Sequence, residues 1–172
     1  MTDDLPRAAT AVVDAARSLG LELEVREFPD GTRTAADAAR AIGCKVDQIV
    51  KSLVFVADTE PVLVLTSGGN RVDVVKVGKE RSAAVVRKAD AGEVRAATGY
   101  AIGGTPPFGH ARDLAVLIDR DLTGFEVVWA AAGTPRHVFP ITPADLLRAT
   151  GGQVADVALV EAGPPAAEGP LS

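Results

Sequence analysis

Residues 98–110, TGYAIGGTPPFGH, form the segment of this chain best suited to holding a small polar ligand. The segment contains four glycines and two adjacent prolines. A Gly-Gly pair allows backbone conformations that other residues resist, and a Pro-Pro pair stiffens the chain that follows. The pattern therefore predicts a shaped loop with exposed backbone amides. It lacks the spacing of a P-loop or of a dinucleotide fingerprint, and a purely structural connection explains the residues equally well.

Other polar residues that could do chemistry lie before and after this loop. Lys51 begins one apolar run, Asp119 ends another, and His137 follows the turn at 132–136. An ammonium group suits a phosphate or a developing oxyanion, although a lysine at a strand end is by default a solvated residue. His137 fits a surface position as well as a pocket. Asp119 fits a carboxylate that supports the loop by accepting amide hydrogen bonds.

Other common catalytic and metal-binding patterns do not fit this sequence. The two histidines and the one cysteine are widely separated, which does not suit a structural zinc site. No Gly-x-Ser-x-Gly nucleophile motif is present. Cys44 follows Gly43 at a predicted helix end, where a small buried filler is the favoured interpretation. We therefore expect no metal and no cofactor.

The composition predicts one globular domain. The chain has 172 residues, of which 47% are hydrophobic, enough to bury a substantial core. No apolar run is long enough to span a membrane, and the acidic N-terminus does not resemble a signal peptide. The single cysteine excludes an internal disulfide and fits a reducing compartment. We expect a cytoplasmic protein without a membrane partner.

The charge is unevenly distributed. The net charge of −5 does not indicate a DNA-binding protein. Residues 71–95, however, carry seven basic side chains against four acidic ones. Such a patch can steer phosphates toward an otherwise acidic protein, but an ordinary solvated face would have the same composition.

Hydrophobic periodicity and capping signals predict the elements that position these residues. Two apolar runs joined by the turn at 58–61 predict an antiparallel hairpin, and Pro140 indicates an edge strand. Residues 161–172, rich in Pro, Gly and Ala, are expected to form a disordered tail. The segment 72–77 fits a helix or a strand. The expected helices are 5–19, 34–43, 89–99 and 142–150, and the expected strands are 21–26, 52–57, 62–66, 114–118, 126–131 and 138–141.

The order and spacing of these motifs resemble the YbaK/ProX family, the free-standing relatives of the editing domain inserted in bacterial prolyl-tRNA synthetases. The resemblance extends from about residue 34 to residue 150. Ile49–Leu53 matches the motif I-x-K-[ST]-L, and Gly103–Pro107 matches G-x-x-x-P. The segments Val116–Asp119 and 132–137 follow in the family's order, with His137 one position farther from the glycine than in many relatives.

The resemblance implies an α/β (α+β) fold in which a mixed, mostly antiparallel sheet curls toward a barrel between flanking helices. It implies a helix at 72–77 and a single editing-like domain over residues 1–160. The implied activity is a trans-acting aminoacyl-tRNA deacylase. Such an enzyme hydrolyses the ester at the 3′ acceptor end of a tRNA mischarged with a small amino acid such as Ala, Cys, Ser or Thr. An aminoacyl-tRNA synthetase would be a further partner.

The resemblance also suggests which residues form the site. Lys51 would fix the terminal adenosine, and the glycine loop would offer backbone amides to the ester carbonyl. Since no general base is evident, positioning would supply the catalysis. The alternative is a non-catalytic module whose pocket holds a nucleotide, an amino acid or a partner protein. The expected catalytic residues are Lys51, Gly103 and Gly104, and the expected substrate-binding residues are Thr105, Pro106, Pro107, Phe108, Asp119 and His137.

Overall fold

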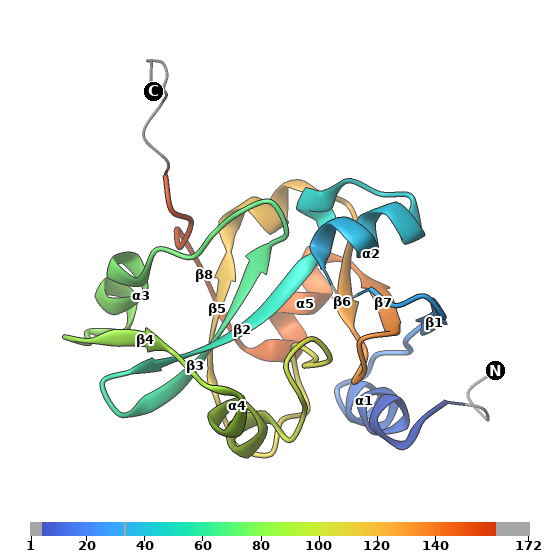
Figure 1. The fold of residues 1–172 in the computed structure, drawn as a ribbon, viewed down its shortest axis with the longest axis horizontal. Coiled ribbons are helices and arrows are strands. Elements are labelled where there is room, and N and C mark those ends of the chain that lie inside the picture. Colours follow the sequence, from blue (N-terminus) through green and yellow to red (C-terminus); the bar gives the residue numbers. More distant parts are fainter. Residues whose placement is uncertain (1–4, 33, 161–172) are drawn as a thin grey trace, which may run out of the picture.

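Two β-sheets with helices packed around them make up the computed structural model, which describes residues 5–32 and 34–160 (Figure 1). The helices are α1 (Arg7–Ser18), α2 (Ala35–Ile42), α3 (Val74–Arg81), α4 (Ala91–Thr98) and α5 (Pro143–Thr150), with short 3-10 helices η1 (Val46–Gln48) and η2 (Arg120–Gly124). The strands are β1 (Arg26–Glu27), β2 (Val50–Ala57), β3 (Glu60–Ser67), β4 (Val86–Lys88), β5 (Ala115–Asp119), β6 (Val128–Ala131), β7 (His137–Ile141) and β8 (Gln153–Ala155). The expected tail at 161–172 lies outside the described residues.

The two sheets meet where β2 and β6 begin. The larger sheet has the strand order β4-β2-β3-β5-β8, with β5 parallel to both of its neighbours and the other pairs antiparallel. The smaller sheet, β1-β7-β6, is antiparallel. A parallel bridge between Ile49 and Trp129 joins them, and Gln48 Nε2 donates to Val127 O beside it (3.0 Å). The α+β class and the mostly antiparallel pairing are confirmed, although the strands form two sheets instead of one.

Local capping signals place the helix ends. Thr34 Oγ1 accepts from the Asp37 amide at 3.0 Å, and Thr142 Oγ1 accepts from the Asp145 amide at 3.1 Å. Helix α4 ends at Gly99, whose φ of 85° is left-handed and favours glycine. The predicted helices and the hairpin β2–β3 are therefore confirmed. The segment at 72–77, which fitted a helix or a strand, contains the first residues of helix α3, which begins at Val74.

Three strand predictions need correction. Residues 21–25 alternate between more and less buried side chains, but pairing starts only at Arg26. The short strands β4 and β8 carry too few residues for a periodic signal. Strand β7 lies in the centre of its sheet, not at the edge. Pro140 is tolerated there because β1 pairs only with His137 and Val138, so no strand needs a donor from Pro140 on that side.

Side chains of β2 alternate between two apolar clusters. Val50 and Val54 belong to the main core, which also contains α1, the glycine loop and Phe139 of β7. Leu53 and Phe55 pack on the opposite face, toward Val77 of α3. By this alternation, the side chain of Ser52 lies on the same face of β2 as Val50 and Val54, and the side chain of Lys51 lies on the face of Leu53 and Phe55.

The segment after α5 is tied to α3. Lys76 Nζ lies 3.0 Å from Asp156 Oδ1 and donates to Ala158 O at 2.8 Å. Lys76 belongs to the basic stretch at 71–95, but these contacts occupy its ammonium group. Lys76 therefore holds the segment after α5 against α3, and its ammonium group is not free to bind a phosphate. Among the helices of the described residues, none has the length and apolar character needed to cross a membrane.

Candidate active site

A cavity of about 420 Å³ opens where β2 and β6 diverge beyond the Ile49–Trp129 bridge. It brings together Lys51, Gly103 and Thr105, three of the residues that the sequence singled out. The remaining lining residues are Thr32, Thr34, Ala35, Ala38, Ile49, Val50, Ser52, Leu53, Gly68, Ile102, Trp129, Ala130, Ala131 and Val138. Its wall is therefore mostly apolar, with one cation and a few hydroxyl groups.

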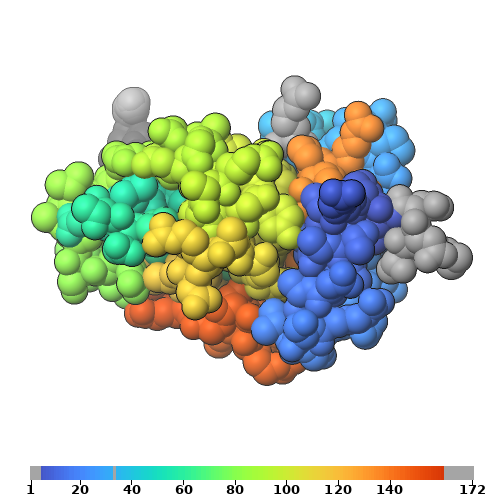
Figure 2. Space-filling model, turned by 90° about the horizontal axis from the view of Figure 1, so that it is seen from below, coloured from blue at the N-terminus to red at the C-terminus, as the bar shows by residue number. Residues whose placement is uncertain are grey.

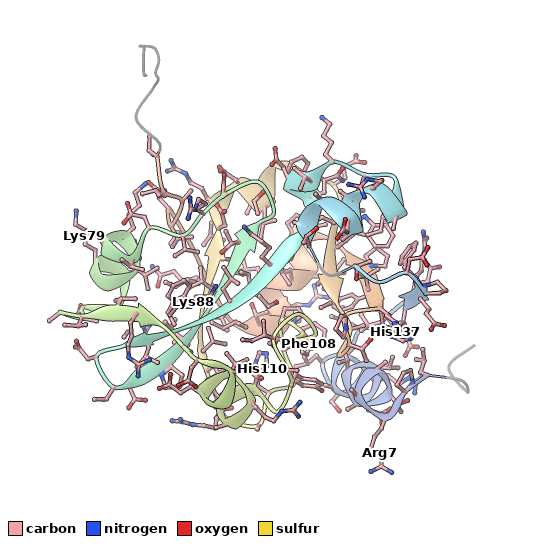
Figure 3. All side chains as sticks on the ribbon, in the orientation of Figure 1. Arg7, Lys79, Lys88, Phe108, His110 and His137 are labelled. Atoms are coloured by element: carbon pink, nitrogen blue, oxygen red, sulfur yellow. The ribbon has the colours of Figure 1, made fainter. Side chains whose placement is uncertain are left out.

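Lys51 is held at the cavity by the turn after β3. Its Nζ donates to the main-chain oxygen of Asn70 at 2.6 Å. Burial lowers the pKa of Lys51 below its ordinary value, and the positive charges of Arg71 and Lys88 act in the same direction, whereas Asp119 opposes them. Lys88 stands on β4 beside β2 (Figure 3). The ammonium group of Lys51 and the nearby charges of Arg71 and Lys88 suit an anionic group of a ligand.

Asp119 supports that turn and does not line the cavity. Its side chain is buried, with 1% exposed. Oδ2 accepts from the Ser67 amide at 3.0 Å and from Asn70 Nδ2 at 2.9 Å, and Oδ1 accepts from the Asp121 amide at 3.0 Å. Asp119 therefore positions Asn70, whose carbonyl in turn holds Lys51. The sequence predicted a carboxylate that accepts amide hydrogen bonds, but placed it under the glycine loop.

The two adjacent glycines of the loop differ in their surroundings. Gly103 has a φ of 92° and lies at the cavity, and a Cβ built on it would lie 3.9 Å from Pro135 Cγ, an ordinary van der Waals contact. Gly104 is buried, and its amide donates to Ala101 O at 3.0 Å. A Cβ on Gly104 would lie 2.8 Å from Gly133 O. Gly104 therefore permits a close approach of the two backbones. Its amide is already bonded within the loop, so it cannot donate to a substrate, contrary to the prediction.

Pro106, Pro107 and Phe108 belong to the core side of the loop. All three are buried, and Phe108 packs against Phe139 with ring centroids 5.8 Å apart. His110 Nε2 lies 2.7 Å from Pro106 O. Helix α1 and this loop lie side by side on the face seen in Figure 2, and a Cβ on Gly109 would lie 2.7 Å from Ala15 Cβ. These residues shape the loop but do not line the cavity.

His137 lies next to the cavity but outside it. Its side chain is 3% exposed, and its Nδ1 is 2.6 Å from Thr134 Oγ1 (Figure 3 labels His137 at the start of β7). It lines a second, larger hollow of about 970 Å³. Ile102 and Gly103 line both hollows, so the tip of the glycine loop separates them.

Sequence reasoning missed most of the wall. Ala35 and Ala38 come from α2, whose start was predicted from the Thr34 cap without any link to the site. Trp129 lies at the base of the cavity, with the Arg26 guanidinium 4.9 Å from the centre of its ring. The single tryptophan of the chain was the one signal that could have marked this place.

The chemistry open to this site is binding and positioning. The described residues that line it include no carboxylate and no imidazole. Nor do three His, Cys, Asp or Glu side chains gather anywhere in the described parts of the chain in a way that could hold a metal ion. A cation, a glycine at the tip of the loop and an apolar wall suit a ligand with an anionic group and a small apolar part.

Several known proteins are similar to this chain over most of its length. Residues 29–149 match the aminoacyl-tRNA editing domain family. The protein YwhH of Bacillus subtilis is 32% identical over 125 residues, covering 73% of this chain and 80% of YwhH. The "Putative Cys-tRNA(Pro)/Cys-tRNA(Cys) deacylase EbsC" of Enterococcus faecalis is 26% identical, covering 74% of this chain and 79% of its own. The crystal structure of "a putative trans-editing enzyme for prolyl tRNA synthetase" superposes with a TM-score of 0.87 and 47% identity, covering 91% of this chain and all of that one.

Proposed function

The chain belongs to the aminoacyl-tRNA editing domain family, and from this premise we propose that it is a trans-acting aminoacyl-tRNA deacylase for a small amino acid. Similar proteins are named as a deacylase and as a trans-editing enzyme. The observation that carries the proposal is the joint presence of Lys51, Gly103 and Thr105 at one small cavity. We expect the protein in the cytoplasm, where its tRNA substrate and a prolyl-tRNA synthetase partner occur.

In this reaction water adds to the ester carbonyl carbon, and the bond from that carbon to the ribose oxygen breaks. The proton of the water passes to the ribose oxygen, so that the free amino acid and the 3′-hydroxyl of the tRNA leave. Lys51 would hold a phosphate of the terminal nucleotide and thereby orient the ester. Because no carboxylate or imidazole is among the described residues that line the cavity, catalysis would come from positioning and from polar groups around the carbonyl.

The size of the cavity supports a small amino acid. Four of its lining residues are alanines, namely Ala35, Ala38, Ala130 and Ala131. About 420 Å³ must hold both the aminoacyl group and part of the adenosine. Alanine, serine, cysteine and threonine are therefore the residues that we expect to be released.

The tRNA body would approach the basic stretch at 71–95. Lys79 and Arg81 are exposed on α3, and Lys88 is exposed on β4 beside the cavity. Lys79 points away from the sheet into open space (Figure 3). Phosphate contacts of this kind weaken with rising salt and carry little sequence information.

The test is release of amino acid from tRNAs charged with Pro, Ala, Ser, Thr or Cys. We expect hydrolysis above the spontaneous rate for at least one small amino acid. Lys51→Ala should remove most of this activity, and Lys51→Arg should retain part of it. Lys45→Ala is the control, because Lys45 is exposed and does not line the cavity.

Full activity in folded Lys51→Ala protein would overturn the role of Lys51. If no charged tRNA is hydrolysed although the protein binds adenosine derivatives, the chain is a non-catalytic binding module.

A further inference from the structure

One edge of β2 carries unpaired main-chain groups beside the cavity. Strand β2 pairs with β3 along its whole length, but on its other edge it pairs with β4 only at residues 55–57. The Ala89 amide also donates to Val54 O on that edge (3.0 Å). Main-chain groups of alternate residues point to the same edge of an antiparallel strand. The N–H and C=O of Ser52 therefore point to the edge where the cavity lies.

The ladder between β4 and β2 stops one hydrogen-bonded pair short of Ser52. Arg87 lies opposite Val56, and Ala89 follows opposite Val54. Continued by two residues, the ladder would place residue 91 opposite Ser52, but α4 begins there and carries the chain away. In the described parts of the chain, no strand takes that place.

The opposite side of the cavity is formed by an edge of β6. The pairs Ala130–Phe139 and Ala132–His137 direct those residues toward β7. By the same alternation, the main-chain groups of Ala131 face β2. The two strands run parallel from the Ile49–Trp129 bridge and separate beyond it. The cavity is thus a gap between two strand edges.

We propose that the aminoacyl group binds in this gap as one residue of an antiparallel strand, paired with the main chain of Ser52. This inference rests on the proposed deacylase function and identifies what holds the amino acid. An extended aminoacyl ester presents an ammonium group and a carbonyl oxygen with the spacing of a strand residue. Two residues that form a hydrogen-bonded antiparallel pair exchange both bonds. The ammonium donates to Ser52 O, and the ester carbonyl accepts from the Ser52 N–H.

The pairing determines which parts of the bound amino acid the protein contacts. Ammonium and ester carbonyl occur in every aminoacyl-tRNA, so the main chain of Ser52 recognises the class without regard to the side chain. In an antiparallel pair of L-residues, the two side chains lie on the same face, with Cβ atoms about 4.5–5.5 Å apart. The substrate side chain therefore lies beside that of Ser52.

The hydroxyl of Ser52 fits that position. Its Oγ is buried and has no hydrogen-bond partner within the described structure. It stands on the face of β2 that carries Val50 and Val54, at a residue that lines the cavity. A change of χ1 rotamer would let Oγ meet a polar substrate side chain. A D-residue paired in the same way would direct its side chain to the face of Lys51.

The test compares non-hydrolysable derivatives of adenosine 5′-phosphate, which keep a phosphate for Lys51: the 3′-(L-alanylamino)-3′-deoxy compound, its D-alanyl isomer, and the propanoylamino compound that lacks the amino group. We expect the L-alanyl compound to bind at least about tenfold more tightly than the propanoyl compound, because a charged hydrogen bond is lost. In protein labelled with ¹⁵N-serine, the amide of Ser52 should shift with the L-alanyl compound. Lys51→Ala should weaken both compounds by the same factor.

Ser52→Ala keeps the main chain, so the preference for the amino group should persist in this variant. If Ser52→Ala abolishes that preference, the hydroxyl and not the main chain holds the ammonium. Equal binding of the L-alanyl and propanoyl compounds, or an unmoved Ser52 amide in the bound state, overturns the pairing but leaves the deacylase function standing. Failure of every adenosine derivative to bind would instead contradict the proposed function itself.

Discussion

Replacing Asp119 tests whether a buried carboxylate controls the site through the turn after β3. In Asp119→Asn the side chain keeps one acceptor oxygen. If that oxygen takes the place of Oδ2, the bonds from Ser67 and Asn70 remain and only the bond from the Asp121 amide is lost. A hydrogen bond to a charged group contributes about 1.5–3 kcal/mol. We therefore expect the free energy of unfolding to fall by about 1.5–3 kcal/mol.

The same substitution should lower deacylation, because a neutral amide oxygen holds the Asn70 side chain less tightly than a carboxylate does, and Asn70 O in turn holds the Lys51 ammonium. The assay is urea unfolding together with the deacylation rate of the folded enzyme. Asp121→Asn is the matched control: Asp121 is exposed and contacts the same Asn70 side chain at 2.8 Å. That control should change stability by less than about 0.5 kcal/mol. The reasoning is refuted if Asp119→Asn unfolds like the wild type, or if it loses stability yet keeps the full rate.

Three further predictions follow from contacts described above. Both Gly104→Ala and Gly103→Ala should lower the melting temperature, Gly104→Ala because its Cβ would press on the backbone of residue 133 and Gly103→Ala because a φ of 92° strains any residue other than glycine. Gly103→Ala should also reduce the deacylation rate of the folded protein, because Gly103 lies at the cavity. Lys79→Glu should weaken tRNA binding and reduce its salt dependence without changing the melting temperature, but Lys76→Glu should lower that temperature by releasing the segment at 156–158. Burial lowers the pKa of His110 in the folded state, so the unfolded chain binds a proton more readily. Stability should therefore fall as the pH drops below about 6.5, and less so in His110→Gln, as measured by thermal unfolding across that range.

The elements that were predicted correctly carry local signals. Thr34 and Thr142 cap helices with their own side chains, and Gly99 ends α4 with a left-handed φ. The elements that were missed depend on distant partners. β8 has three residues and is a strand only because β5 lies beside it. Residues 21–25 have the alternation of a strand, yet no neighbouring strand pairs with them.

Some of the residues that line the cavity were predicted from the sequence because they belong to local motifs. Lys51, Gly103 and Thr105 reach one cavity, as the family motifs indicated. The loop motif could not tell which of its residues face the ligand and which face the core, because helix α1 and Phe139 decide that. Asn70 was not predicted, since its contribution is a main-chain oxygen that no residue type reveals.

Strand β8 limits where this domain can be cut when it is fused to another protein. It follows the stretch that matches the family, yet it covers β5, and Ala155 lies opposite Asp119. A chain cut after residue 150 would bare the β5 edge, and bare edges recruit foreign strands. The cut would also loosen Asp119 and with it the turn that holds Lys51. A functional transplant of this domain must therefore include residues 151–160 or provide a substitute strand from its host.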